Sequence, residues 1–186
     1  YNEHEYQLLQ QGWQVTRKTQ ASQLVGADLA VIVNPNNPDG RSVLPQELLA
    51  LADRVEFLVI DESFCDPLPD LSVCPHLTAA HDNVLVLRSF GKFYGLAGAR
   101  LGFAIGEQAV LDKMADRMGS WAVSGPSLAI GKAALGDQNW ATRMREQLTH
   151  DAHRLDQIAA LAGWQTIGGT SLFRLYQMTD ARHWQE

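Results

Sequence analysis

The sequence predicts an α/β fold built around a mostly parallel sheet. Three apolar runs, each about as long as a strand, end at Val33, Ile60 and Leu87, and helical or loop segments separate them. That alternation is typical of parallel sheets covered by helices. Polar residues follow each run, and right-handed crossovers align the C-terminal ends of parallel strands along one edge. We therefore expect one shared crevice at that edge. The residues expected there are Asn34, Asn37, Asp61, Ser89 and Lys92.

Composition and charge exclude several classes of partner. The 186 residues are 46% apolar and can form the core of one domain, or of one domain and part of another. A net charge of −6 argues against nucleic acid or an anionic membrane, and no apolar run is long enough to span a bilayer. Cys65 and Cys74 give no disulfide framework, so we expect a cytoplasmic protein with packed thiols. The histidines are scattered, and no metal site is expected.

The first half of the chain alternates helices and strands. Gly12 is the expected stop of the first helix, and the turn residues of 34–40 (NPNNPDG) end the first apolar run, at Val33. Leu48, Leu49 and Leu51 supply the buried face of the helix that follows. In order, we expect a helix over 1–11, strands over 13–17 and 28–33, a helix opening at Pro45, and a strand over 56–60.

The second half is expected to be mainly helical. In order, the expected elements are strands over 84–87 and 101–105, helices over 107–118, 126–135 and 140–162, and a strand over 171–176. Gly163 should end the long helix, whose apolar seam is Met144, Leu148, Leu155, Ile158 and Leu161. We expect a first domain over 1–138 and a connecting helix with the start of a second domain over 139–186. Because the chain begins at Tyr1 and not Met, we expect a fragment of a longer protein.

The stretch from Val84 to Gly102 (VLVLRSFGKFYGLAGARLG) carries the main candidate site. Its glycines allow tight turns and a close approach to a ligand. A lysine over an apolar floor loses hydration, and the neutral amine can then condense with an aldehyde. Ser89 and Arg100, on either side of Lys92, could hold a phosphate. Together they suit pyridoxal 5′-phosphate, whereas the plainer alternative is a Gly-rich loop with a solvent-facing lysine.

Two further polar residues fit the same cofactor. Asp61, at the end of an apolar run, could stand beside a pyridine nitrogen and keep it protonated; otherwise it caps a turn. Asn37 could donate its amide to the phenolic oxygen of the ring; otherwise it is a turn residue. Arg100 could instead form a surface ion pair. Each plainer interpretation is acceptable by itself. Given the order of these residues and their places after strands, it is much less expected that all of them lack a function than that any one of them does.

Three motifs resemble the fold-type I pyridoxal phosphate enzymes of the aspartate aminotransferase superfamily: NPNNPDG (34–40), DESF (61–64) and SFGKFYGLAGARLGF (89–103). The resemblance implies a three-layer α/β/α large domain, the start of a small α+β C-terminal domain, and a homodimer. It also implies roles for six residues. These are Lys92 as the catalytic Schiff-base lysine, Asp61 beside the pyridine nitrogen, Asn37 at the phenolic oxygen, Ser89 and Arg100 at the phosphate, and Tyr1 stacked on the ring.

Within this superfamily the chain resembles two branches. Segments 120–135 (SWAVSGPSLAIGKAAL) and 168–175 (GGTSLFRL) are more similar to threonine-phosphate decarboxylases, which convert L-threonine O-3-phosphate to (R)-1-aminopropan-2-yl phosphate in cobalamin synthesis. Histidinol-phosphate aminotransferases are the alternative. The family places Trp121 and Ser124 near the substrate, whereas a packed helix entry is the plainer interpretation. Because substrate-binding groups would lie outside the fragment, we expect the fragment alone to be nearly inactive.

One residue departs from the family pattern. Phe64 occupies a position where many members have a tyrosine that bonds the phenolic oxygen, so the cofactor environment should differ, unless Phe64 merely packs. A regulatory aminotransferase-like domain is the non-enzyme alternative, disfavoured by the lack of a basic stretch. A dinucleotide-binding domain is excluded because no GxGxxG follows the first apolar run.

Overall fold

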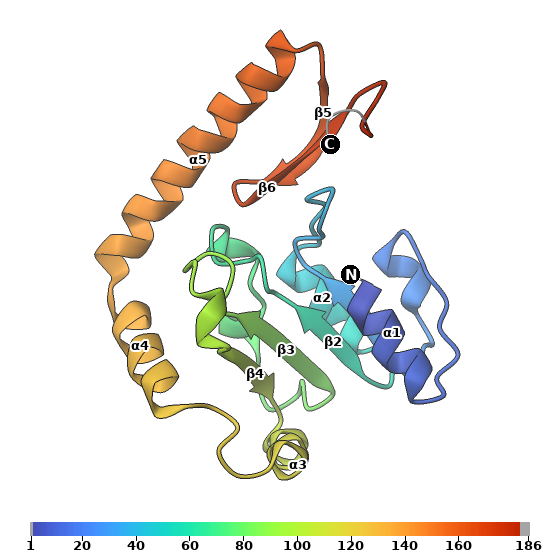
Figure 1. The fold of residues 1–186 in the computed structure, drawn as a ribbon. Helices are drawn as coiled ribbons and strands as arrows, with labels where there is room; N and C mark the ends of the chain where they lie inside the picture. The colour runs from blue at the N-terminus through green and yellow to red at the C-terminus, as the bar shows by residue number, and fades with distance from the viewer. Residues whose placement is uncertain (1, 183–186) are drawn as a thin grey trace.

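A four-stranded sheet organises most of the chain. The computed structural model describes residues 2–182, and Figure 1 shows their arrangement. The strands, in chain order, are β1 (Ala30–Val33), β2 (Leu58–Asp61), β3 (Val84–Ser89) and β4 (Gly102–Gly106). They are neighbours in that order, with β1, β2 and β3 parallel and β4 antiparallel to β3. The prediction of an α/β fold with a mostly parallel sheet is therefore confirmed.

The register of the parallel strands brings their C-terminal ends together. Val33 pairs with Asp61, and Asp61 pairs with Leu87. The pairing continues one step further, because the amide of Asn34 donates to the carbonyl of Asp61 and the amide of Glu62 to that of Leu87 (2.9 and 2.8 Å). The polar residues that follow the three strands therefore start from one edge of the sheet, as the sequence predicts.

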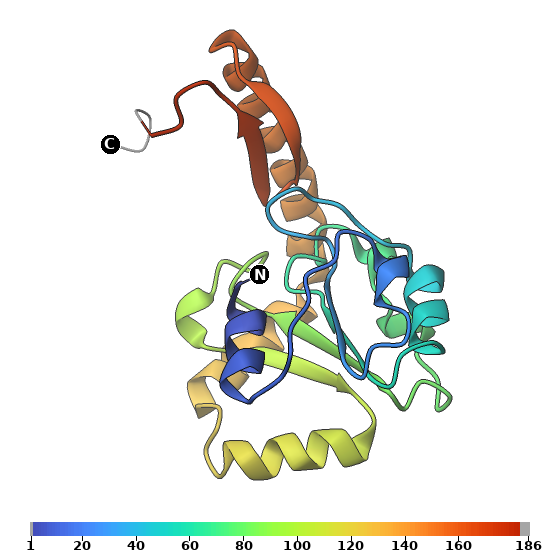
Figure 2. The ribbon, with the colours of Figure 1, turned by 90° about the vertical axis from the view of Figure 1, so that its right-hand side faces the viewer.

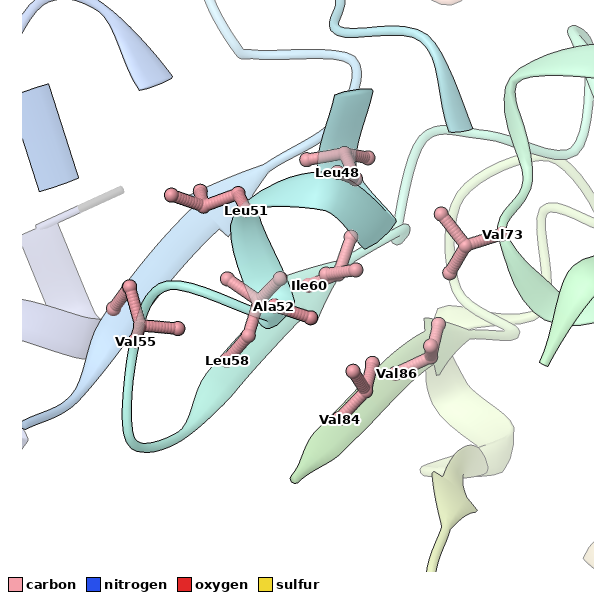
Figure 3. Packing of buried hydrophobic residues seen from close by; sticks show 10 residues of the cluster. Leu48, Leu51, Ala52, Val55, Leu58, Ile60, Val73, Val84 and Val86 are labelled. Carbon is pink, nitrogen blue, oxygen red and sulfur yellow. The ribbon is translucent and has the colours of Figure 1, made fainter. Parts of the chain in front are cut away.

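The hydrophobic core lies between this sheet and helix α2 (Pro45–Ala52). Figure 3 shows Leu48, Leu51 and Ala52 of α2 over the strands, with Val73 on the side of Val86. Proline at the first helical position begins α2, as expected, because its missing N–H has no partner there. The buried cluster consists of Ala30, Leu48, Leu51, Ala52, Val55, Leu58, Ile60, Val73, Val84 and Val86.

Helices cover both faces of the sheet. Leu58 and Ile60 belong to the core beside α2, and side chains alternate along a strand, so Asp61 faces the other way. There it contacts His4 of α1 (Asn2–Gln10), which places α1 on the opposite face. The result is the three-layer α/β/α arrangement that the family resemblance implies. Among residues 2–182, no helix combines the length and apolar character needed to cross a membrane.

The rest of the chain extends away from this sheet. Helices α3 (Gln108–Met118) and α4 (Gly125–Gly136) lead into α5 (Gln138–Leu161), which runs along one side of the molecule in Figures 1 and 2. After α5, strands β5 (Gln165–Thr170) and β6 (Phe173–Gln177) pair as an antiparallel hairpin. The hairpin lies beyond the end of the main sheet, close to the loop that follows β1.

The structure corrects three expectations about these elements. Residues 13–17 form no strand, because no neighbouring strand pairs with them in the described chain. The apolar seam of α5 is buried only in part, with Leu155 and Ile158 exposed and Leu161 90% exposed. The β5–β6 hairpin contacts this half of α5 at Asp156, but it leaves these three side chains uncovered. The strand β5 was not predicted, since its GG pair interrupts the strand pattern.

Candidate functional site

Asp61 is a buried carboxylate at the end of β2. It is 6% exposed, and its Oδ2 lies 2.7 Å from Nε2 of His4, while Oδ1 accepts a hydrogen bond from the Ser63 amide at 2.9 Å. Burial alone would raise the pKa of Asp61. The hydrogen bonds from His4 and Ser63, with the charge of His4, outweigh burial and lower the pKa below its usual range. Asp61 is therefore ionised at neutral pH.

His4 is a site residue that the sequence analysis missed. It lies 57 positions before Asp61, on an amphipathic helix where a histidine gives no signal of its own. The one available clue is its place three residues after Tyr1, the expected ring-stacking aromatic. Tyr1 itself lies outside the described residues.

The loop that presents Lys92 is anchored by aromatic side chains. Phe90 and Phe93 are 1% and 4% exposed, and Phe93 packs edge-on against Trp140 of α5. Lys92 lies between them in sequence but is exposed, with Nζ 5.5 Å from the ring centroid of Phe64. The apolar floor expected beneath Lys92 is thus a single phenyl ring. The expected loss of hydration is not seen, because the described chain leaves the lysine open to solvent.

Ser89 and Arg100 are brought together by the pairing of β3 with β4. Ser89 pairs with Gly102, and the Phe90 amide donates to the carbonyl of Leu101 at 3.1 Å. Arg100 is two residues before Gly102, in a left-handed conformation with φ of 50°. A non-glycine residue seldom adopts that conformation, and such residues are frequent at functional sites. Its guanidinium is exposed and donates to the carbonyl of Ala97 at 3.3 Å.

Two asparagines in the loop after β1, Asn34 and Asn37, lie in different surroundings. Asn34 is fully buried and bonds both ways to the backbone of Val43, at 2.9 and 3.1 Å, so it stabilises the loop. Asn37 is half-buried and lines a cavity of about 950 Å³ between α1, residues 13–21 and β1. This cavity does not include Asp61 or Lys92.

The five described candidates lie on segments at one edge of the sheet. They are Asn37, Asp61, Ser89, Lys92 and Arg100. A second cavity, of about 450 Å³, lies between the Lys92 loop and α4, and none of the five candidates lines it. The strand ends therefore meet at one edge of the sheet as expected, and a crevice shared by all five residues stays a prediction. Chemically, the edge offers an open amine, an ionised carboxylate, a hydroxyl and a guanidinium.

A buried ionic network stands directly behind this edge. Glu62 is fully buried and accepts hydrogen bonds from the Ser72 hydroxyl (2.6 Å), the Val73 amide (2.7 Å) and Nη1 of Arg88 (2.9 Å). Nη2 of Arg88 lies 2.5 Å from Oδ1 of Asp66. Burial would lower the pKa of Arg88, but the charges of Asp66 and Glu62 raise it, so the guanidinium stays charged. The sequence analysis missed this network, although an arginine within an apolar strand is a signal for a buried partner.

The residues near α4 and the cysteines have plain explanations. Ser124 caps α4 by accepting from the Ser127 amide at 3.2 Å. Trp121 is 95% exposed, so its interpretation as a packed helix entry is wrong for the described chain. Burial raises the pKa of the Cys65 thiol to about 12, and that of Cys74 is raised for the same reason, which leaves both thiols protonated.

Comparisons with known proteins place this arrangement among aminotransferases. The chain is 42% identical to the threonine-phosphate decarboxylase of a Sinorhizobium species, over all of this chain and 56% of the relative. It is 39% identical to the threonine-phosphate decarboxylase of Pseudomonas aeruginosa, over 98% of this chain and 56% of the relative. The chain therefore spans about half the length of the curated relatives it matches.

The fold and the family agree with these relatives. The histidinol-phosphate aminotransferase of Sinorhizobium meliloti, solved in complex with pyridoxal-5′-phosphate, superposes with a TM-score of 0.70 at 27% identity, over 76% of this chain and 40% of that one. The family model "Aminotransferase class I and II" matches residues 2–185. The chain belongs to the class I and II aminotransferase family.

Proposed function

We propose that this chain is part of a pyridoxal phosphate-dependent lyase that decarboxylates L-threonine O-3-phosphate. The observation that carries the proposal is its 42% and 39% identity to two threonine-phosphate decarboxylases along essentially its whole length. The product would be (R)-1-aminopropan-2-yl phosphate, which serves cobalamin synthesis. The motif residues at the strand ends support the cofactor part of the proposal, because they offer the groups that pyridoxal phosphate needs.

The chemistry of the described residues fits pyridoxal phosphate. Lys92 would attach the cofactor, since its amine is solvent-exposed and can meet the aldehyde. Asp61, held ionised by His4 and Ser63, would pair with the pyridine nitrogen. Ser89 and Arg100 would bind the phosphate. Two more ligands belong to the proposal from the family resemblance alone, Asn37 at the phenolic oxygen and Tyr1 on the ring.

The bound cofactor supplies an electron sink for bonds at the α-carbon of an amino acid. The chain supplies orientation and proton transfer. Asp61 holds a negative charge at one end of the site, because His4 and Ser63 stabilise the carboxylate form. With cofactor and substrate bound, the Lys92 ammonium would deliver a proton to the α-carbon after carbon dioxide has left. Arg100 and Ser89 would hold the phosphate of the cofactor, so that the reacting carbon stays within reach of Lys92.

A histidinol-phosphate aminotransferase is the second candidate. It is supported by the superposition on the Sinorhizobium meliloti enzyme and by a 36% identical aminotransferase of that name from a Ruegeria species. The two candidates differ in what leaves the α-carbon. Release of carbon dioxide from threonine phosphate identifies the first, and transfer of an amino group to 2-oxoglutarate identifies the second.

The organisation of the whole protein belongs to the same proposal. Residues 1–138 would form part of a cofactor-binding domain, and 139–186 a connecting helix with the start of a second domain. A cytoplasmic homodimer is proposed from the family resemblance. Exposed apolar residues of the described chain, such as Leu128 and Trp121, are compatible with burial in such an assembly.

The test compares the full-length protein with a Lys92→Ala variant. We expect the parent to bind pyridoxal phosphate with visible absorbance, and borohydride reduction to fix its mass on the peptide that contains Lys92. Lys92→Ala should lose both signals and all carbon dioxide release. A variant that keeps the absorbance would overturn the assignment of Lys92, and amino transfer without carbon dioxide release would favour the second candidate.

A further inference from the structure

The β5–β6 hairpin contacts the loop after β1 through backbone atoms. The amide of Gly169 donates to the carbonyl of Asp39 at 3.0 Å. A Cβ atom on Gly168 would overlap the carbonyl oxygen of Asp39, and one on Gly40 would overlap that of Gly169. Two glycines from distant parts of the chain, Gly40 and Gly168, thus allow this approach. Both ribbon views show the loop reaching the hairpin at this place (Figures 1 and 2).

The local geometry of β5 presents the two glycines to the loop. The pairing with β6 shifts register between Thr166 and Gly168, which leaves Ile167 as an extra residue in β5. Such a bulge bends a strand and re-aims the residues after it. Gly169 has φ of 134°, a conformation that favours glycine, whereas the φ of Gly168 is not positive. An alanine at Gly168 would therefore meet the loop without straining its own backbone.

A second contact joins the same hairpin to the Lys92 edge. The ring of Phe173 packs edge-on against that of Phe64, with centroids 5.0 Å apart and planes at 79°. Phe64 is also the ring beneath Nζ of Lys92. The hairpin is tied to α5, because Nε of Arg174 and the Tyr176 hydroxyl donate to Asp156 at 2.9 and 2.8 Å.

From these contacts we propose that Gly168 and Phe173 are positioning residues that dock the hairpin over the site edge. Gly168 sets the distance between hairpin and loop, and the docked hairpin presses Phe173 against Phe64. Phe64 in turn limits where the Lys92 side chain can lie. Docking also holds the loop that carries Asn37. This inference rests on the proposed function, since it concerns access of the phosphorylated amino acid to Lys92.

The experiment uses full-length protein with three variants. Gly168→Ala inserts a methyl group into the contact, and Phe173→Leu keeps an apolar side chain but removes the aromatic edge. Gly136→Ala is the matched control, because a Cβ there meets nothing within 4 Å and its φ is not positive. Hydrogen exchange is followed by mass spectrometry on peptides covering 36–40 and 165–172, without substrate. Steady-state kinetics with threonine phosphate gives kcat and KM.

We expect Gly168→Ala to speed exchange in both peptides and to raise KM roughly two- to tenfold, the effect of losing about one hydrogen bond. Phe173→Leu should raise KM in the same direction, with cofactor absorbance kept in every variant. Gly136→Ala should match the parent.

Unchanged hydrogen exchange in Gly168→Ala would overturn the docking contact. Faster exchange with an unchanged KM would overturn the positioning role. If Gly168→Ala does not fold, an unchanged KM in Phe173→Leu overturns the proposal. Absence of cofactor absorbance in the parent protein would instead contradict the proposed function.

Discussion

Asp61 and Glu62 are consecutive carboxylates at the end of the same strand, yet they sit in opposite environments. Asp61 faces α1 and pairs through its Oδ2 with Nε2 of His4. Glu62 is fully buried and is held by Ser72, Val73 and Arg88. Strand alternation sorts the two side chains to opposite faces. The comparison teaches that two consecutive buried carboxylates can be held in different ways: Asp61, the proposed cofactor partner, bonds a histidine and one backbone amide, whereas Glu62 belongs to an ionic network with Arg88.

The strongest way to break this comparison is to remove the partner of Glu62. Arg88→Met leaves Glu62 and Asp66 without their shared cation inside the protein, and unfolding in urea should show a loss of about 3–5 kcal/mol. Arg17→Met is the matched control, because it breaks a solvent-exposed pair with Glu5 and should leave the urea midpoint near that of the parent. Equal midpoints for the two variants would show that the network behind the sheet is not structural.

Removing the charge of Asp61 should lower the free energy of unfolding by less than Arg88→Met does, and the size of this loss should depend on pH. Asp61→Asn weakens charged hydrogen bonds, which at pH 7 should cost roughly 1–3 kcal/mol. Because the folded-state pKa of Asp61 is lowered, the contribution of its charge is fully present above its unfolded-state pKa of about 3.9 and is lost as pH falls through the folded-state value. Urea unfolding at pH 7, 5 and 3 checks this. A difference between parent and variant that stays constant down to pH 3 contradicts the lowered pKa.

The smallest effect is expected for the pairing of His4 with Asp61. A double-mutant cycle with His4→Ala and Asp61→Asn should give a coupling energy of about 1 kcal/mol at pH 7, because the pair is partly open to solvent. The same cycle with Arg88→Met and Glu62→Gln should give a clearly larger value. Coupling energies of the same size in both cycles would erase the distinction between the two carboxylates.

The sequence predicts the parts of this structure in which local pattern and topology agree. The three parallel strands, the proline that begins α2 and the polar residues at the strand ends follow from apolar runs, turn residues and crossover geometry. The family motifs then imply which of those polar residues serve the cofactor. The backbone of the site could therefore be anticipated before any coordinates.

What escaped prediction depends on contacts between distant segments. His4 and Asp61 are 57 positions apart, and no periodicity links them. Glu62 looks like a surface residue until Arg88 is placed beside it across β2 and β3. Residues 13–17 have a strand-like pattern, but a strand needs a partner, and none lies beside them in the described chain. The expected loss of hydration at Lys92 is wrong, and the solvent-facing lysine named as the alternative is what the described chain has, because the flanking phenylalanines occupy the apolar interior.

Strand β1 has a practical consequence for work with this chain. Its outer edge pairs with no strand among residues 2–182, and it consists of the apolar sequence AVIV. Unpaired N–H and C=O groups along a hydrophobic strand edge can pair with a strand of another molecule. Such pairing favours aggregation during expression and concentration. Samples of these 186 residues alone should be kept dilute, and a charged residue introduced at Val31 would be the first change to try for better-behaved preparations.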